Sequence, residues 1–286
     1  MVRITREGGF RGSTENRDRI PVMRTGLPSV PPDATAWTWV GHASYVLRMG
    51  GACVLIDPVW SDKIVGTPPR LTPPGVAWSE LPAVDAVLIS HDHYDHLDWP
   101  TLRKLPRSTP ILAGKALGRW FRRRGFDAVT ELDWWESAEV AGLRFDFTPT
   151  HHWSRRGLFD TCATLWGGWV ITGPDGTRTY HAGDSGYGER FAEVGRRYPG
   201  IDVAMMPIGA YEPRWFMRNL HMNPGEAITA LDDLGARRLA TMHWGTFVLT
   251  REPVDEPLRL IRKEWAAAGK DPDDLWALAV GETRVD

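Results

Sequence analysis

A segment of six residues contains three imidazole and two carboxylate side chains, which are groups that bind transition metals in proteins. The six residues are His91, Asp92, His93, Tyr94, Asp95 and His96. The apolar residues 86–89 precede them and predict a short buried strand. Side chains of a strand alternate between two faces, so a strand could not turn His91, His93 and His96 to one side. We therefore expect a loop at the end of a strand, folded around a metal ion as in a metal-dependent hydrolase.

Further donors follow other strand-like runs. They are the adjacent pair His151 and His152, then Asp184, then His243. If these runs belong to one sheet, their ends meet at a common edge and the donors converge. A single histidine after a strand is usually a structural residue, but several such donors downstream of the first loop favour a dinuclear site. The adjacency of His151 and His152 leaves open which of the two points inward.

The rest of the pattern predicts the elements that position these residues. Short apolar runs predict strands at 38–40, 44–47, 53–56, 86–89, 111–112, 128–132, 139–147, 164–172, 177–182, 203–206 and 239–242. Helical patterns lie at 99–105, 115–124, 189–198, 224–234 and 258–268. Strand-rich and helical stretches alternate in both halves. The expected fold is α+β, a four-layer αββα sandwich of two mixed sheets with helices outside.

The chain divides into an arm and one domain. Residues 1–35 are rich in Arg, Gly and Pro and predict an extended arm. Residues 36–286 contain no linker or repeat and predict a single catalytic domain. The proline-rich residues 60–82 predict a long surface loop, either a lid over the site or a decoration.

Composition excludes several classes of protein. Lys plus Arg (34) nearly equals Asp plus Glu (36), so we expect no nucleic-acid partner. No stretch approaches the roughly 20 apolar residues of a membrane span, and the N-terminus lacks the apolar segment of a signal peptide. Cys53 and Cys162 are expected to be reduced, which fits a cytoplasmic location.

Two further features have alternative interpretations. Residues 122–124 are three arginines, expected at a solvated helix end, with phosphate binding as the alternative. The fifteen tryptophans are expected in the core and cleft wall, or alternatively at an apolar surface for a lipid-like ligand.

Longer strings of residues carry a family resemblance. They lie at 39–44, 90–98, 131–136, 152–153, 165–167, 182–187, 207–217 and 243–247. The chain resembles the metallo-β-lactamase superfamily and, within it, the N-acyl-phosphatidylethanolamine-hydrolysing phospholipase D group. The strings at 207–217 and 243–247 are the specific ones, because the first loop alone marks only the superfamily.

The resemblance implies a ligand set and a mechanism. One metal would be held by His91, His93 and His152, a second by Asp95, His96 and His243, with Asp184 bridging both. Two zinc ions are expected, with iron or manganese as alternatives. A hydroxide between the ions would attack the substrate, while Asp95 and Asp184 position the pair.

Other residues are implied on the substrate side. His221 would donate a hydrogen bond or a proton to the substrate, or else serve a structural role at a helix start. Tyr211, Arg214 and Trp215 are candidate cleft residues. His42 is a further candidate for the substrate side and is also expected to orient a ligand.

The leading interpretation is a phosphodiesterase of phospholipase D type that acts on N-acyl-phosphatidylethanolamine-like substrates. The alternative is a lactonase or amide-type hydrolase that uses the same dinuclear site. The expected partner is a small-molecule or lipid-like ester. The sequence leaves open peripheral contact with a membrane and assembly into a homodimer.

Overall fold

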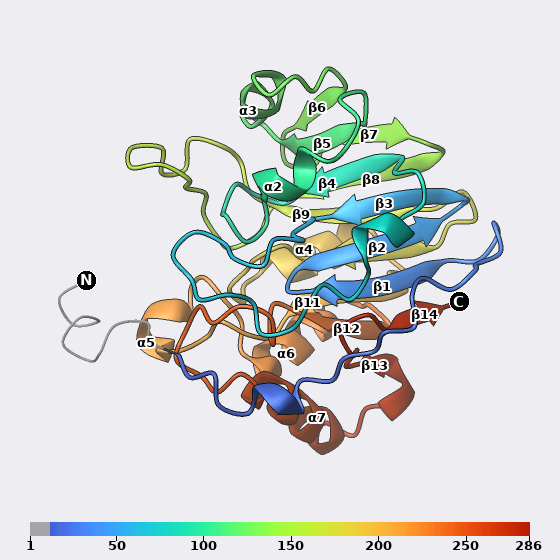
Figure 1. Ribbon diagram of the computed structural model, residues 1–286. Helices are drawn as coiled ribbons and strands as arrows, with labels where there is room; N and C mark the ends of the chain where they lie inside the picture. Colours follow the sequence, from blue (N-terminus) through green and yellow to red (C-terminus); the bar gives the residue numbers. More distant parts are fainter. Residues whose placement is uncertain (1–11) are drawn as a thin grey trace.

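Two sheets of seven strands form the centre of the computed structural model, which describes residues 12–286 (Figure 1). The first sheet contains β1 (Ala36–Gly41), β2 (Ser44–Met49), β3 (Ala52–Ile56), β4 (Ala86–Ile89), β5 (Ile111–Gly114), β6 (Val129–Leu132) and β14 (Thr283–Val285). The second contains β7 (Ser137–Val140), β8 (Leu143–Thr148), β9 (Gly168–Thr172), β10 (Arg178–His181), β11 (Val203–Pro207), β12 (Arg238–Met242) and β13 (Leu275–Trp276).

Each sheet combines an antiparallel half with a parallel half. The strand order is β14-β1-β2-β3-β4-β5-β6 in the first sheet and β13-β12-β11-β10-β9-β8-β7 in the second. The strands from β3 to β6 run parallel, as do those from β10 to β13. Because parallel strands end at the same edge, the segments after β3 and β4 lie together, as do those after β10 and β12. These segments hold most of the predicted donors.

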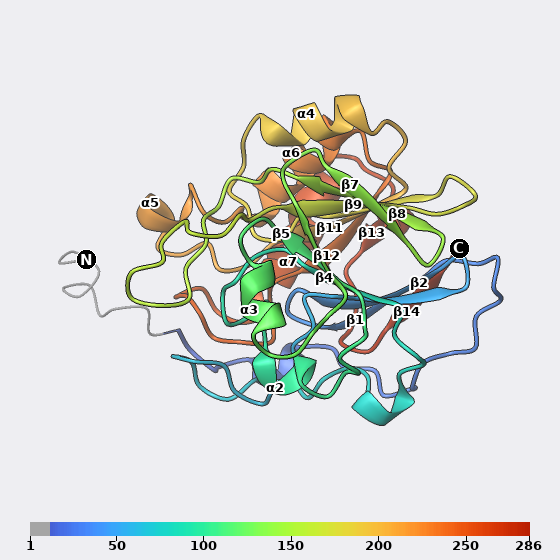
Figure 2. The same ribbon diagram turned by 90° about the horizontal axis from the view of Figure 1, so that it is seen from above.

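Helices cover both outer faces of the sandwich. They are α2 (Trp99–Leu102), α3 (Gly118–Arg122), α4 (Arg190–Arg197), α5 (Arg214–Met217), α6 (Pro224–Leu234) and α7 (Glu256–Ala267). Figure 2 shows α4 and α6 outside the second sheet and α2 outside the first. The expected α+β sandwich of two mixed sheets with outer helices is confirmed. Within residues 12–286, every helix is too short or too polar to span a bilayer.

Alternation along the strands builds two apolar cores. In β3, Val54 and Ile56 face the core between the sheets, whereas Cys53 and Leu55 face the side covered by α2 and α3. Successive side chains of a strand point to opposite faces, so a strand covered on both sides must be apolar throughout. This explains why these strands are continuous apolar runs in the sequence.

The structure corrects several predicted boundaries. The predicted strand 139–147 is the hairpin of β7 and β8, because Ala141 (φ 52°) and Gly142 (φ 77°) form a tight turn with positive φ. The predicted helix 115–124 shortens to α3, because Ala116 (φ 72°) cannot continue a helix. Helix 99–105 shortens to α2, and strand 164–172 to β9. The prediction lacks β13 and β14, which are too short to show a pattern.

The segment before β1 packs along the domain. Arg17–Arg19 form a single 3-10 turn, Val22 bridges to Val280, and Ile20 is buried in the central core. Residues 1–11 of the predicted arm lie outside the described residues.

Candidate metal centre

The first group of donors lies on a tight loop directly after β4. The backbone amides of His96 and Leu97 both donate to the carbonyl of His93, at 3.1 and 2.8 Å. Asp98 ends the loop and caps α2 by accepting from the amide of Thr101. The segment is a loop rather than a continuation of the strand, so its imidazoles can turn to one side.

Two groups of donors meet at this loop. Within each group, one ligand atom per residue lies within 4.8 Å of the others. The first group is His91, His93, His152 and Asp184. The second group is His42, Asp95, His96 and His243. The structure thus brings all seven predicted ligands together, although most are far apart in sequence.

Asp184 lies between the two groups. One carboxylate oxygen, Oδ2, is 3.1 Å from Nε2 of His96 and 3.7 Å from Nε2 of His152. The other oxygen, Oδ1, is 3.1 Å from Nε2 of His243. Gly183, with φ 59°, turns the chain sharply after β10 and directs this carboxylate inward. A carboxylate that faces both groups is the geometry expected of a bridging ligand.

Hydrogen bonds determine which imidazole nitrogens face the centre. Nδ1 of His152 donates to the carbonyl of Leu220 at 3.0 Å, and Nδ1 of His96 donates to Asp57 at 2.7 Å. Nδ1 of His91 donates to Ser90 Oγ at 2.9 Å, because that hydroxyl gives its own proton to Asp57. All three rings therefore direct an Nε2 lone pair inward, as metal-binding histidines do.

These lone pairs face an anion. Nε2 of His96 faces Asp184 Oδ2 and Nε2 of His243 faces Asp184 Oδ1, and both nitrogens are buried without a hydrogen-bond partner. A nitrogen lone pair opposite a carboxylate oxygen is repulsive unless a proton or a metal ion lies between them. Burial opposes charge on His96, but the Asp184 and Asp95 carboxylates outweigh it and raise its pKa well above the usual value, so the centre calls for positive charge at this place. The donor set, nitrogen and oxygen without thiolate, suits zinc, iron or manganese. The residues therefore fit two metal ions, which the structure does not contain.

The pKa shifts of the histidines reflect the same balance between burial and the neighbouring carboxylates. Burial lowers the pKa of His91 and of His152 and keeps both imidazoles neutral, the form that binds a metal. Burial also opposes charge on His243, but the Asp184 and Asp95 carboxylates outweigh it and raise the pKa of His243 to about 9. The centre therefore favours positive charge beside Asp184.

Asp57 is a functional residue that the sequence reasoning missed. It follows β3, is fully buried, and accepts hydrogen bonds from the Ser90 amide (2.7 Å) and hydroxyl (2.6 Å) as well as from His96. Through these bonds it orients both His96 and His91. Its place after an apolar strand was the available signal, the same signal that identified Asp184.

His42 also belongs to the centre. Its Nε2 donates to Asp95 Oδ2 at 2.9 Å, and its backbone carbonyl accepts from the His243 amide at 3.0 Å. The side chain is buried, so we assign it to orienting Asp95 in place of substrate contact.

The structure separates the adjacent histidines. His152 joins the first donor group, whereas the side chain of His151 is exposed and lies outside both groups. His181, expected to be a buried hydrogen-bonding residue, contacts the Ala43 carbonyl at 3.0 Å and accepts from the Gly183 amide.

His221 lies next to one histidine of each donor group. Its ring centroid is 5.1 Å from those of His152 and His243, and it can form a donor group with Asp184 and His243. Burial lowers the pKa of His221 to about 3, so its imidazole is neutral. The start of α6 is formed instead by Asn223, whose side chain accepts from the Glu226 amide.

Tyr211 and Arg214 are engaged with the protein itself. The Tyr211 hydroxyl donates to Glu256 at 2.7 Å, and Arg214 donates to the His221 carbonyl at 2.8 Å and pairs with Glu226. These contacts hold the segment that carries His221, and a substrate role for the two residues stays a prediction. Trp215 lies on α5 with a partly exposed side chain, and its substrate role stays a prediction.

Hydrogen bonds and packing contacts hold the loop of residues 60–82 beside the metal centre. Trp60 Nε1 donates to the Val76 carbonyl at 2.8 Å, and the Leu71 amide donates to the Thr246 carbonyl at 2.8 Å. Ile64 packs with Phe247 and Tyr94. These contacts favour a fixed wall, and movement as a lid stays a prediction.

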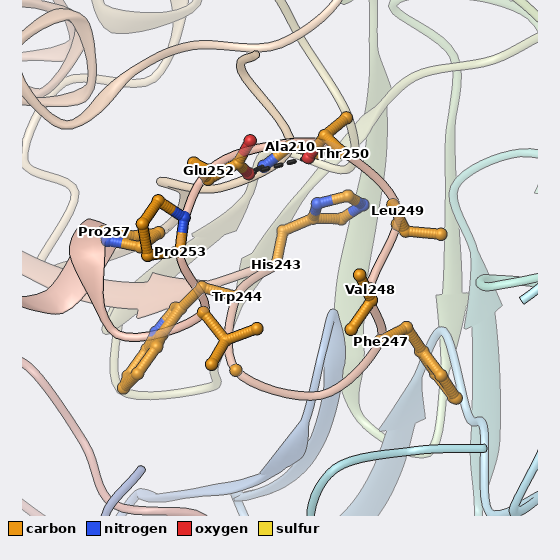
Figure 3. A pocket seen from close by; sticks show the side chains of 12 residues that line it. Ala210, His243, Trp244, Phe247, Val248, Leu249, Thr250, Glu252, Pro253 and Pro257 are labelled. Atoms are coloured by element: carbon orange, nitrogen blue, oxygen red, sulfur yellow. Dashed lines mark hydrogen bonds between the residues drawn. The ribbon is translucent and has the colours of Figure 1, made fainter. Parts of the chain in front are cut away.

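Two cavities differ in what they can admit. A cavity of about 20 Å³ lies behind His243, among Trp244, Val248 and Glu252 (Figure 3). It has room for about one water molecule. A groove of about 660 Å³ begins at His152 and is lined by Trp134, Trp166 and Tyr187, with Arg190 and Arg196 at its side. Of these two, the groove is the one large enough for a substrate.

Comparison with known proteins adds a family match and named relatives. The model of the Beta-lactamase superfamily domain matches residues 53–244. The N-acyl-phosphatidylethanolamine-hydrolyzing phospholipase D 1 of Caenorhabditis elegans is 37% identical over 77% of this chain and 67% of its own length. A UPF0173 metal-dependent hydrolase of Nitratidesulfovibrio vulgaris is 32% identical over 74% of this chain and 81% of its own.

A solved structure shares the fold. The isothiocyanate hydrolase from Delia radicum gut bacteria superposes with a TM-score of 0.70 at 21% identity, over 87% of this chain and 98% of that one. The chain spans about two thirds or less of the length of the relatives at 35–43% identity.

Proposed function

Since the chain belongs to the beta-lactamase superfamily and is one of its metal-dependent hydrolases, we propose that it is a dinuclear phosphodiesterase of phospholipase D type. The proposed substrates resemble N-acyl-phosphatidylethanolamine. The observation that carries the dinuclear part is Asp184, whose carboxylate faces His152 of the first donor group as well as His96 and His243 of the second. The similarity to the C. elegans enzyme supports the substrate class.

His91, His93 and His152 would hold one ion, and Asp95, His96 and His243 the other, with Asp184 shared. When bound, two such ions lower the pKa of a water molecule towards about 7 and polarise the oxygen of the ester. Zinc is the proposed metal.

The chain's own residues orient the reactants. Asp57 and Ser90 fix the rings of His96 and His91, while His42 fixes Asp95. His221 is neutral and carries one N–H, which would donate to a phosphoryl oxygen of the substrate. Arg214 and Tyr211 hold the loop of His221 in place.

The groove at His152 would bind the remainder of the substrate. Trp134 and Trp166 contact each other edge to face, with ring centroids 5.7 Å apart, and offer an apolar wall for acyl chains. Arg196 at the side of the groove would supply positive charge for a phosphate, whereas Arg190 is paired with Glu193 at 2.7 Å.

The test is a panel of soluble substrates with metal-loaded protein: a chromogenic phosphodiester, an acyl lactone and a β-lactam. We expect the highest kcat/KM on the phosphodiester. A higher value on the lactone or the β-lactam would instead support the alternative, a lactonase or amide-type hydrolase.

The bridging role is tested by Asp184→Asn. We expect loss of at least one bound metal and a fall in kcat/KM of more than about 100-fold, since one ligand serves both ions. Metal content is measured by mass spectrometry, with His151→Ala as the matched control. Wild-type metal content and rate in Asp184→Asn would remove the bridging role.

A further inference from the structure

Two large apolar side chains protrude from a loop near the metal centre. Leu158 is 77% exposed and Phe159 is 99% exposed. Among the large hydrophobic residues in the described part of the chain, no other side chain is as exposed. Both lie between β8 and β9, a few residues after His152. Exposed apolar residues usually occur singly, so an adjacent pair this exposed indicates a contact surface.

The loop is built to hold this tip outward. The Asp160 carboxylate accepts from the Gly157 amide at 2.7 Å, and the Cys162 amide donates to the Ser154 carbonyl at 2.8 Å. The Ser154 hydroxyl donates to the Thr164 carbonyl at 2.6 Å. These bonds close the loop on itself, so the exposure of the tip belongs to a defined conformation.

Arginines surround the tip. Arg155 and Arg156 precede it directly, and the Arg156 guanidinium lies over the rings of Tyr94 (4.1 Å) and Trp120 (5.2 Å). Trp120 belongs to α3, whose Arg119 is exposed, as is Arg123 directly after the helix, whereas Arg122 pairs with Glu131. The stack therefore joins the apolar tip to the basic residues of α3, the residues 119–124 that the hydrolytic site does not use.

The loop is also joined to the metal centre. The Arg156 guanidinium donates to the Asp92 carbonyl at 2.9 Å, and Thr164 donates to the Asp92 carboxylate at 3.0 Å. In both views the loop before β9 lies at the same end of the molecule as α5, where Trp215 is 41% exposed (Figures 1 and 2).

We propose that the loop of residues 154–164 docks the protein on an anionic lipid bilayer. Leu158 and Phe159 insert between the lipids, while Arg155 and the basic residues of α3 contact phosphate head groups. Apolar side chains that enter the interface beside basic residues that attract anionic lipid are the two contributions on which peripheral membrane binding depends. The loop follows His152, so docking would place the metal centre near the membrane surface.

A second copy of the chain fits this surface less well. A stable dimer buries about 1,200–2,000 Å² in total, far more than two protruding side chains supply. Two copies meeting through this loop would also bring their arginines together, which is repulsive.

The test compares binding to phosphatidylcholine vesicles with and without phosphatidylglycerol, by co-sedimentation and without any turnover. Wild-type protein is expected to bind the anionic vesicles. The double variant Leu158→Ser/Phe159→Ser should lose about tenfold or more of its partition coefficient. The matched control is Val285→Ser, at a residue that is 50% exposed on β14 near the C-terminus.

A second readout uses Cys162, which is exposed within the loop, whereas Cys53 is buried. A polarity-sensitive dye on Cys162 should shift its emission to the blue when anionic vesicles are added. Vesicle binding that is unchanged in the double variant would overturn the proposal. So would a wild-type dimer that the double variant converts to a monomer, since the tip would then contact a second copy.

These outcomes are independent of the proposed hydrolysis. Turnover of a soluble phosphodiester should be equal in wild type and the double variant. Loss of vesicle binding with that turnover intact supports docking, whereas absence of turnover in both proteins contradicts only the proposed hydrolytic function.

Discussion

His96 shows how single hydrogen bonds decide what an imidazole can do. Its Nδ1 gives a proton to Asp57, so its Nε2 faces Asp184 and is the nitrogen left to bind a metal. His152 is fixed in the same way by a carbonyl oxygen on a different segment. At the scale of residues, the centre therefore depends on partners that do not contact a metal themselves.

Asp57→Asn tests this dependence. The asparagine NH2 group would replace one of the oxygens that accept hydrogen bonds from Ser90 and His96, so two donors would face each other. We expect metal affinity to fall about 10- to 100-fold, measured by competition with a chelating dye. Circular dichroism of the metal-free variant checks that the fold is kept. Affinity equal to wild type would show that Asp57 does not orient the ligands.

His152→Ala and His151→Ala form a matched pair. The first should remove a ligand and reduce metal content and kcat/KM by more than about 100-fold, whereas the second should leave metal content unchanged. Mass spectrometry of the purified proteins measures the metal. Loss of metal in His151→Ala but not in His152→Ala would show that His151 is the ligand.

The two cysteines should differ in reactivity. Burial first, and the nearby Asp85 carboxylate second, raise the pKa of the Cys53 thiol from its ordinary value of 9.0 to about 12, while Cys162 is exposed. A thiol reagent at pH 8 should modify one thiol quickly in native protein and both after denaturation. The folded state keeps the Cys53 proton where an unfolded thiol loses it, so this residue reduces stability only above about pH 9. Rapid modification of both thiols in native protein would contradict the buried position.

At the scale of elements, the capping of helix α6 fixes the chain next to His221. Asn223 and Glu226 form a capping box at its start, Pro224 occupies the first turn, and Gly235 (φ 62°) ends it. The helix begins three residues after His221 and packs against the second sheet through Leu231 and Leu234. Its cap therefore fixes the chain that leads away from the metal centre.

Asn223→Ala removes the cap. We expect a loss of about 1 kcal/mol in the free energy of unfolding and a fall of about 2 °C in Tm. Thr229→Ala on the exposed side of the same helix is the control and should change Tm little. Equal Tm values for the two variants would show that the cap contributes no stability.

At the scale of the whole molecule, the centre is assembled from both sheets. The segments after β3 and β4 supply Asp57 and the first loop, and those after β10 and β12 supply Asp184 and His243. The buried Asp95 and Asp184 carboxylates favour positive charge between the two sheets, as the raised pKa of His243 shows. Bound cations would therefore join the two halves of the sandwich.

Removal of metal should lower the stability of the whole domain. A ligand present at about 1,000 times its Kd adds about 4 kcal/mol, so we expect a chelator to lower Tm by about 10 °C. Differential scanning fluorimetry after dialysis, and again after addition of zinc, manganese or iron(II), measures the change. Identical Tm values with and without metal would contradict the structural coupling.

The sequence by itself determined the α+β class, most strands and the candidate metal donors, apart from the choice between His151 and His152. The side-chain types of these donors and their positions after apolar strands are local properties that a linear pattern retains. The tertiary structure separates His152 from His151, because Nδ1 of His152 is held by a carbonyl 68 residues away. It also revealed the role of Asp57 and the exposure of Phe159. Hydrogen-bond partners and burial depend on segments distant in sequence, so no pattern within a segment contains them.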